Sequence, residues 1–157
     1  MTKAEHTHLQ TTLHHAAVVV PNLDNAIDFY CRGVGAELVK RSSWETGTEL
    51  FDSLTGLRNC SAKFCLLKIG HSYIELFEYG STVYQSPAEE QADKLGIRHL
   101  AFQVADIEEA ERNLTDAGAS SVGERIHVTG GGSARYMRDP FGNIIELLVP
   151  GGKMPPA

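Results

Sequence analysis

The sequence lacks any long hydrophobic run. None of the apolar stretches in its 157 residues approaches the roughly eighteen residues that a membrane span needs. The first ten residues, MTKAEHTHLQ, also lack the apolar core of a secretory signal peptide. These absences predict a cytoplasmic protein with no membrane partner.

Basic residues and cysteines are scarce as well. Fourteen Lys and Arg against twenty Asp and Glu give a net charge of −6 without any basic cluster, so no nucleic-acid partner is expected. The three cysteines, Cys31, Cys60 and Cys65, show no metal-type spacing and leave an odd one out. We therefore expect reduced thiols, with Cys65 packed inside a strand.

The chain contains one unit twice, which is the first feature to settle because a repeat fixes the architecture. The stretch LHHAAVVVPNL at 13–23 overlays IRHLAFQVADI at 97–107, so that His15 falls on His99. Each copy of the unit therefore opens on a strand that carries a histidine.

The ends of the two copies match in the same way. SYIELFEYG at 72–80 overlays NIIELLVPG at 143–151 and places Glu75 on Glu146. The first copy carries about thirteen extra residues, which we place between residues 41 and 61. Each copy thus closes on a strand that carries a glutamate.

Local signals predict the order strand, helix and three strands in each copy, and hence an α+β fold. Asn22 is expected to cap a helix at 23–31, and Asp106 with Glu109 forms a capping-box-like pair before a helix at 107–117. Strands are expected at 15–20, 37–41, 62–69 and 73–79, and, after the strand with His99, at 121–128, 134–138 and 144–149.

The domain organisation follows from these elements. A single domain is expected at 11–150, with module one at 11–80, a polar linker at 81–96 and module two at 97–150. The tails, 1–10 and 151–157, are predicted to be flexible.

Strand alternation places the repeated histidines and glutamates among apolar neighbours. Charged side chains at such positions are rarely buried unless they are paired or bind a metal. If the sheets curve into a shared trough, His15, Glu75, His99 and Glu146 converge on one divalent ion, and octahedral coordination leaves two positions for water or substrate. His14 should point away from this site, because adjacent strand residues face opposite sides.

The motifs resemble a known family. LHHAAVVVPNLDNAIDFY with a downstream IEL, followed by HLAFQVADIEEA and YMRDPFGNIIEL, is similar to the vicinal oxygen chelate (VOC) superfamily. That superfamily includes glyoxalase I, methylmalonyl-CoA epimerase, extradiol dioxygenases and proteins of fosfomycin and bleomycin resistance. The resemblance covers roughly residues 13–150 and implies two βαβββ modules that form a curved sheet around a metal site.

The resemblance also implies a reaction and a set of site residues. One ion of Zn, Ni, Co, Mn or Fe would be held by the two histidines and two glutamates, a ligand set that is typical of bacterial-type glyoxalase I. The expected enzyme is an isomerase or lyase of the glyoxalase I or epimerase type. It chelates a small molecule with vicinal oxygens and moves a proton next to a carbonyl, with Glu146 and Glu75 as the catalytic residues. The expected substrate pocket contains Tyr73, Phe77, Gln103 and Tyr136.

Two other functions stay open at this point. One is an Fe(II) extradiol ring-cleaving dioxygenase, against which Glu75 argues, because it fills a position that the 2-His-1-carboxylate site of those enzymes leaves open. The other is a metal-free ligand-binding resistance protein. Members of the family usually form homodimers, and a site within one chain is favoured over a site shared between two copies.

Overall fold

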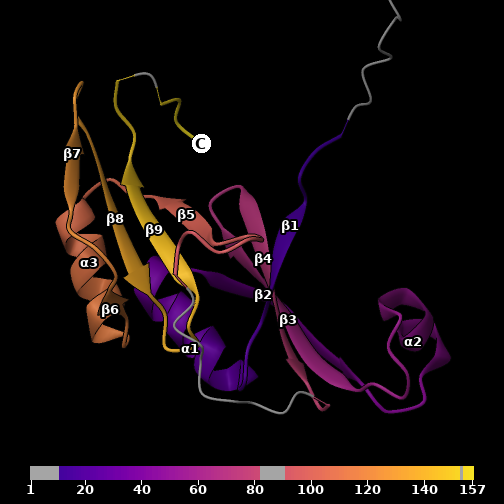
Figure 1. Ribbon diagram of the computed structural model, residues 1–157. Helices are drawn as coiled ribbons and strands as arrows, with labels where there is room; N and C mark the ends of the chain where they lie inside the picture. Colours follow the sequence, from indigo (N-terminus) through magenta and orange to yellow (C-terminus); the bar gives the residue numbers. More distant parts are fainter. Residues whose placement is uncertain (1–10, 82–90, 153) are drawn as a thin grey trace, which may run out of the picture.

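Two β-sheets with a helix on one face of each make up the protein (Figure 1). The computed structural model describes residues 11–81, 91–152 and 154–157. The expected tail at 1–10 and most of the expected linker therefore lie outside the described residues. The predicted α+β fold with two tandem modules is confirmed.

Module one forms the four-stranded sheet, in the order β1-β4-β3-β2. Its elements are β1 (His15–Val19), α1 (Leu23–Val34), β2 (Glu37–Trp44), α2 (Glu49–Thr55), β3 (Ala62–Ile69) and β4 (Ser72–Tyr79). Helix α1 is longer than expected and ends at Gly35, whose φ of 69° lies in the left-handed region that glycine adopts at low cost. Helix α2, inside the inserted segment, was not predicted.

Module two forms the other sheet, in the order β5-β9-β8-β6, with β7 also paired to β8. Its elements are β5 (His99–Gln103), α3 (Ile107–Asp116), β6 (Ser120–Ser121), β7 (Ile126–Val128), β8 (Gly132–Arg138) and β9 (Ile144–Val149). The single strand expected at 121–128 is wrong, since residues 122–125 separate β6 from β7.

Both predicted helix caps are present. The Asn22 side chain accepts a hydrogen bond from the backbone N–H of Asn25 at 2.9 Å. The Asp106 carboxylate accepts from the backbone N–H groups of Glu108 and Glu109 at 2.8 and 3.0 Å. These bonds satisfy backbone donors that have no partner inside the helix and so fix where α1 and α3 begin.

The helices α1 and α3 pack against each other and join the two modules. Gly33 of α1 makes this close approach possible, because a Cβ atom there would lie 2.8 Å from the Leu114 Cδ2 atom of α3. The Tyr30 hydroxyl of α1 adds a cross-module bond by donating to the buried Asp139 carboxylate at 2.9 Å. The modules are therefore held together through their helical sides.

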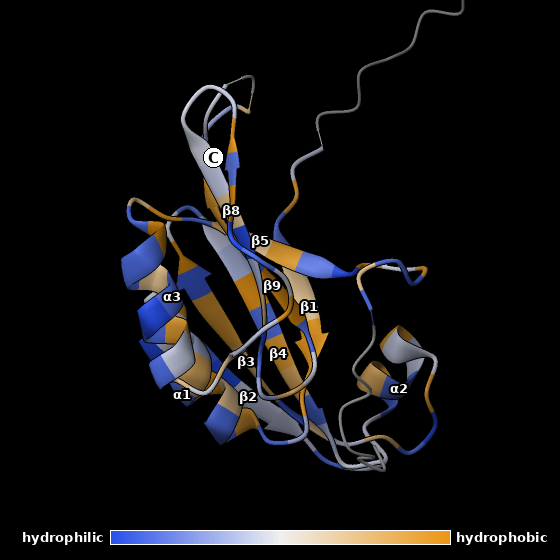
Figure 2. Ribbon diagram, turned by 60° about the vertical axis from the view of Figure 1, so that its left-hand side comes forward, coloured by the Kyte–Doolittle hydropathy of each residue, from blue (hydrophilic) through white to orange (hydrophobic). Residues whose placement is uncertain are grey.

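The inner faces of both sheets supply the hydrophobic core. Alternate residues of the strands, including Leu67, Leu76 and Leu147, are fully buried in one cluster with residues of α1 and α3. In Figure 2 the strands are largely hydrophobic where the helices cover them, whereas the outward sides of α1 and α3 are hydrophilic. The opposite face of each sheet is consequently left free of helix α1 or α3.

Helix α2 lies on the side of the molecule away from α1 and α3 (Figure 1). Trp44 stacks on Phe51 of α2 at 4.2 Å between ring centroids, and the two belong to an aromatic cluster completed by Phe64, Phe77 and Tyr79. The inserted segment thus builds an aromatic wall on the helix-free face of the first sheet.

The remaining sequence expectations concern thiols and charge. The three cysteines are free, Cys65 is fully buried in β3, and burial raises the pKa of its thiol to about 11.

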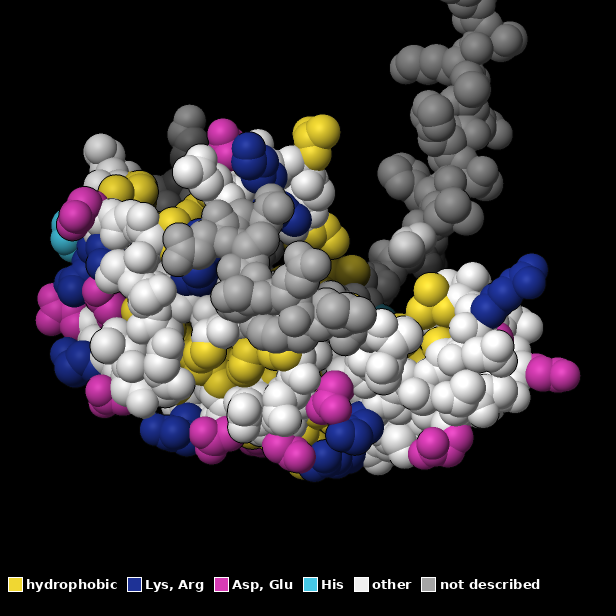
Figure 3. Space-filling model, turned by 60° about the horizontal axis from the view of Figure 1, so that its bottom comes forward, with side chains coloured by type: hydrophobic (Ala, Val, Ile, Leu, Met, Phe, Trp, Pro, Cys, Tyr) yellow, Lys and Arg dark blue, Asp and Glu magenta, His cyan; other side chains and the backbone are white. Residues whose placement is uncertain are grey.

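On the face shown in Figure 3, acidic and basic side chains are intermixed rather than gathered by sign. Among the described residues, no helix is long and apolar enough to cross a membrane.

Candidate metal centre

The first histidine–glutamate pair lies on neighbouring parallel strands. β1 pairs with β4 so that Ala17 is opposite Glu75, which places His15 two residues away on the same face. The His15 Nε2 atom is 3.3 Å from the Glu75 Oε2 atom, and the side chains are 37% and 19% exposed. The pair is therefore formed by folding of module one alone and remains open to solvent.

The second pair repeats this geometry in module two. β5 pairs with β9 so that Ala101 is opposite Glu146, the same register as in module one. The His99 Nε2 atom is 3.2 Å from the Glu146 Oε2 atom, with side-chain exposures of 38% and 17%. The structure therefore brings the four predicted ligands into two matching pairs.

The spacing within each pair suits two ligands of one metal ion. Two donor atoms that each lie about 2.1 Å from an ion are about 3.0 Å apart in octahedral and about 3.4 Å apart in tetrahedral geometry. The observed distances of 3.3 and 3.2 Å fall between these values. An imidazole nitrogen with a carboxylate oxygen is a donor set that divalent first-row metals accept, so the residues present fit such an ion.

The two pairs do not meet within one chain, which corrects the expectation of an intrachain site. Among the described residues, which include all four ligands, no group of three or more His, Cys, Asp or Glu side chains could hold a metal. The physical reason is the packing of the modules. Each pair lies on the face opposite to its own helix, and the modules are joined through α1 and α3.

His14 does not point away from the site, contrary to the prediction from alternation. Its Nδ1 atom is 2.8 Å from the Nδ1 atom of His15, and its ring stacks on Tyr73 at 5.6 Å with an interplanar angle of 11°. Alternation fails here because β1 begins at His15, so the backbone before it is not strand.

Module two has a different residue beside its histidine. The Tyr136 hydroxyl is 3.3 Å from the Nδ1 atom of His99. Burial and, to a smaller extent, the nearby Glu146 carboxylate raise the pKa of Tyr136. Tyr136 and Glu146 share the lining of a cavity of about 290 Å³. Of the predicted pocket residues, Tyr136 therefore has a direct polar contact with a candidate ligand.

The other predicted pocket residues lie on the same faces as the ligands of their modules. Tyr73 is directly opposite His15, and Phe77 lies two residues after Glu75 in the aromatic cluster. Gln103 is at the end of β5, where its side-chain oxygen accepts a hydrogen bond from the backbone N–H of Ala157 at 2.7 Å. The C-terminal residue thus returns to the strand that carries His99.

Sequence comparison adds one decisive observation. Residues 12–147 match the profile of the Glyoxalase/Bleomycin resistance protein/Dioxygenase superfamily. The chain belongs to this superfamily. The match spans both modules and all four candidate ligands, so the resemblance noted in the motifs is confirmed.

Individual members of the superfamily are similar over most of the chain. A 2-epi-5-epi-valiolone epimerase from Actinomyces sp. is 30% identical over an alignment of 148 positions, and the match covers 89% of this chain and 80% of that protein. A glyoxalase family protein from Bacillus cereus has a TM-score of 0.82 at 29% identity, with 95% of this chain and 100% of that chain covered.

A third relative was solved with a metal. The fosfomycin resistance protein FosX from Listeria monocytogenes, complexed with Mn(II) and sulfate, has a TM-score of 0.61 at 18% identity. The alignment covers 93% of this chain and 97% of that chain. At this identity the likeness shows the fold, and the superfamily fold is thereby known to accommodate a divalent metal.

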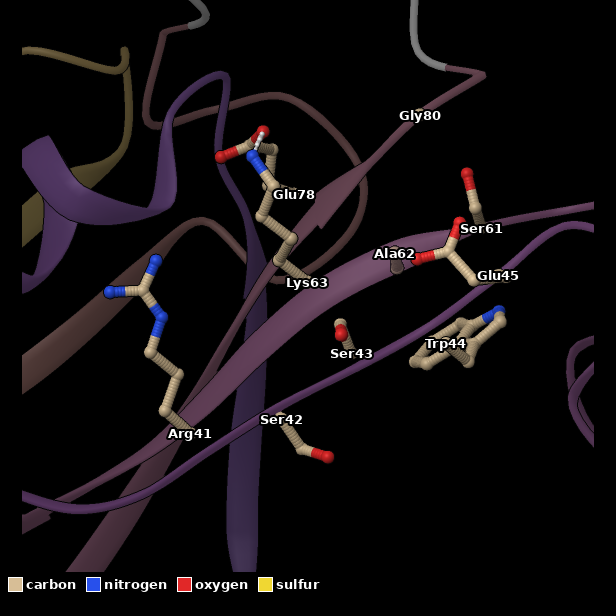
Figure 4. A pocket seen from close by; sticks show the side chains of 10 residues that line it. All are labelled: Arg41, Ser42, Ser43, Trp44, Glu45, Ser61, Ala62, Lys63, Glu78 and Gly80. Carbon is tan, nitrogen blue, oxygen red and sulfur yellow. Dashed lines mark hydrogen bonds and ion pairs between the residues drawn. The ribbon is translucent and has the colours of Figure 1, made fainter.

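A larger cavity of about 420 Å³ lies away from the ligand pairs, at the ends of β2, β3 and β4 (Figure 4). Its charged side chains are largely paired, and Lys63 points at Glu78 with 2.7 Å between Nζ and Oε1. None of the four candidate ligands lines it. The candidate ligand pairs therefore lie outside the larger cavity.

The aromatic cluster is the part of the site region that sequence analysis missed. Phe77 was predicted to line the pocket, but the contribution of Trp44 and Phe51 was not. The signal available was the inserted segment itself, which contains the only tryptophan of the chain. Its position beside a ligand strand depends on contacts between residues that are distant in sequence.

Proposed function

We propose that the protein is a divalent-metal-dependent epimerase or related isomerase that binds a substrate through two neighbouring oxygens. The observation that carries this proposal is the pair of equivalent His–Glu sites, with donor atoms 3.3 and 3.2 Å apart. The similarity to an epimerase over most of both chains supports isomerase chemistry over the lyase alternative.

We further propose that two copies of the chain complete each metal site. His15 and Glu75 of one copy join His99 and Glu146 of the other, because one chain keeps its two pairs apart. Exposed apolar residues on these faces support a partner surface, since Val19 of β1 is 52% exposed and Ile126 of β7 is 53% exposed. A symmetric homodimer then contains two equivalent sites.

The two glutamates have distinct tasks in this proposal. A bound ion would polarise the substrate carbonyl and make the neighbouring C–H group more acidic. Glu146 accepts the proton from that carbon, and Glu75 delivers one on the opposite face, which inverts the carbon. A carboxylate that holds an ion is a weak base and carries no proton, so these roles would require each glutamate to be free of the ion when it takes up or gives up its proton.

The test combines metal analysis with proton exchange. Apo protein is loaded in turn with Zn, Ni, Co, Mn or Fe(II) and incubated in deuterated solvent. The substrates are 2-epi-5-epi-valiolone, a 2-oxoaldehyde hemithioacetal, methylmalonyl-CoA and a catechol, each with and without oxygen. We expect metal-dependent exchange of the proton next to a carbonyl that does not depend on oxygen. Oxygen-dependent catechol cleavage would instead establish a dioxygenase, and binding without metal would establish a sequestering protein.

Glu146→Gln tests the assignment of the base. This variant should lose exchange by about a hundredfold or more while retaining part of its metal, because the amide oxygen still binds an ion but cannot take up a proton. Glu37→Gln, an exposed position on β2, serves as the matched control and should leave exchange unchanged. Undiminished exchange in Glu146→Gln would reduce Glu146 to a ligand alone.

A further inference from the structure

The second ring nitrogens of the two candidate ligand histidines have unlike partners. In each pair the Nε2 atom faces the glutamate, so the Nδ1 atom points to the surroundings. The His15 Nδ1 atom is 2.8 Å from the Nδ1 atom of His14, whereas the His99 Nδ1 atom is 3.3 Å from the Tyr136 hydroxyl. The ligand pairs match, but the groups behind them do not.

The repeat itself shows that these partners are specific to each module. The overlay that places His15 on His99 puts Arg98, not a histidine, at the position of His14. Tyr136 is directly opposite Glu146, and the residue opposite Glu75 is Leu66. Neither partner therefore has a counterpart of its own type in the other module.

The proton positions follow from the direction of each ring. A neutral imidazole has one N–H group, and a nitrogen that binds a metal must offer its lone pair. With Nε2 as the ligand, the proton of each histidine is on Nδ1. His15 then donates to His14, and His99 donates to the Tyr136 oxygen. The His14 Nδ1 atom and the Tyr136 oxygen act as the acceptors, so each bond holds its histidine in the metal-binding tautomer.

His14 is itself held in place by a neighbouring ring. It stacks nearly parallel on Tyr73, which is directly opposite His15 in the sheet, and meets the His15 ring edge-on at an interplanar angle of 86°. His14, although exposed, thus contacts both rings in an orientation that keeps its Nδ1 atom toward His15.

Tyr136 differs because a phenol can both accept and donate. When its oxygen accepts from His99, its own O–H group is left to donate elsewhere. Tyr136 and Glu146 line the same cavity of about 290 Å³. A ligand oxygen in that cavity is a group that this hydroxyl could reach, whereas His14 lines neither this cavity nor the larger one at the ends of β2, β3 and β4.

We infer that the two halves of the metal site are functionally unequal: His14 is a positioning residue that orients His15, and Tyr136 both orients His99 and donates a hydrogen bond to a substrate oxygen. This inference rests on the proposed function. The inequality would fix the orientation of the bound substrate, because two identical ligand pairs could accept a two-oxygen substrate in either orientation. A single hydroxyl at one end selects the orientation in which the reacting carbon faces Glu146.

The first experiment measures metal binding without catalysis. Apo protein is titrated with Co²⁺, whose visible spectrum reports coordination, in wild type, His14→Phe and Tyr136→Phe. Both substitutions keep a ring but remove the hydrogen-bonding atom, so each should weaken Co²⁺ binding by about ten- to a hundredfold. His127→Gln, at an exposed position on β7, is the control for the loss of a histidine and should bind Co²⁺ as wild type does.

The second experiment separates the two roles. Acetohydroxamate, a small probe that chelates metals through two oxygens, is titrated into Co²⁺-loaded protein. Tyr136→Phe should weaken its binding by about three- to tenfold, the effect of one lost hydrogen bond, and His14→Phe should leave it unchanged. NMR of the Zn²⁺-loaded protein, in which Nε2 of His15 is the proposed ligand atom, should show the Nδ1–H proton of His15 at the low field of a hydrogen-bonded group in wild type and at higher field in His14→Phe.

Each outcome decides between distinct conclusions. Wild-type protein that fails to bind Co²⁺ would overturn the proposed function itself. Wild-type binding with unchanged affinity in His14→Phe and Tyr136→Phe would overturn the present inference and leave the proposed function standing. Equal loss of acetohydroxamate binding in both variants would show that the two halves are equivalent, which also contradicts the inference.

Discussion

Two complementary ligand variants test whether the metal site is shared between copies. His15→Ala damages the pair of module one, and His99→Ala damages the pair of module two. In the proposed dimer, each ion is held by module one of one copy and module two of the other. A mixed dimer of the two variants therefore has one site that carries both substitutions and one site that carries neither.

The size of the recovery follows from this arrangement. Random pairing of equal amounts makes about half of all dimers mixed, and each mixed dimer has one intact site of two. We expect the mixture to recover about a quarter of wild-type metal content and turnover, while each variant alone has little of either. The variants are co-expressed with different affinity tags, so that purification through both tags isolates mixed dimers and should raise the recovery to about half.

A second mixture is the matched control. His15→Ala and Glu75→Ala each remove a donor atom from module one, so every site of their mixed dimer contains one damaged pair, and no recovery is expected. If the His15→Ala and His99→Ala mixture stays as poor in metal and activity as its components, the shared site is refuted. Equal recovery in the control mixture would also refute it, because the recovery would then not depend on which pair is damaged.

Three further predictions concern the framework around the site. Tyr30→Phe should lower the free energy of unfolding in urea by about 1–3 kcal/mol, because it removes a donor from the buried Asp139 carboxylate; an unchanged value would contradict the cross-module bond. Glu78→Gln should lower the free energy of unfolding by only about 0.5 kcal/mol, because solvent screens the interactions of a partly exposed carboxylate. Hydrogen bonds in the folded state lower the pKa of Glu78, so the carboxylate stabilises the fold above its unfolded pKa. This stabilisation should disappear as pH falls through the folded pKa, and the unfolding curves of wild type and variant should then converge. Phe51→Ala should shift the emission of Trp44, the only tryptophan, to longer wavelength as α2 loosens, and an unshifted spectrum would show that the stacked ring does not hold the helix.

Sequence patterns predicted those features that depend on neighbouring residues. The side-chain oxygens of Asn22 and Asp106 cap the two long helices as expected, because capping requires only contacts within one turn. Strand alternation also placed His15 on the same face of its strand as Ala17 and Val19, since the side-chain period of a strand is set by its backbone. The pairing of His15 with Glu75 depends in addition on β1 lying beside β4, which is a contact between distant residues.

Features that depend on distant residues could not be read in the same way. Helix α2 has only seven residues, which are too few to be stable alone. It is held in place by the stacking of Trp44 on Phe51. The Asp52 carboxylate also accepts hydrogen bonds from the backbone N–H groups of residues 59 and 60. The separation of the ligand pairs follows from the packing of α1 against α3, where Gly33 closely approaches Leu114, and no periodicity within either module reveals this packing. His14 was misplaced because alternation was extended one residue beyond the strand.

The two modules have kept the same ligand register while their surroundings have diverged. Glu75 and Glu146 face alanines at equivalent positions, yet the first lies beside an aromatic wall and the second beside Tyr136 and a cavity. In the proposed dimer, each ion would be held between the module that carries the wall in one copy and the module that carries the cavity in the other. A substrate bound there would have an apolar surface on one side and a hydroxyl with a carboxylate on the other. Such a site distinguishes the two faces of a carbon even though its metal ligands do not, and this distinction is what an epimerase requires in order to remove a proton from one face and return it to the other.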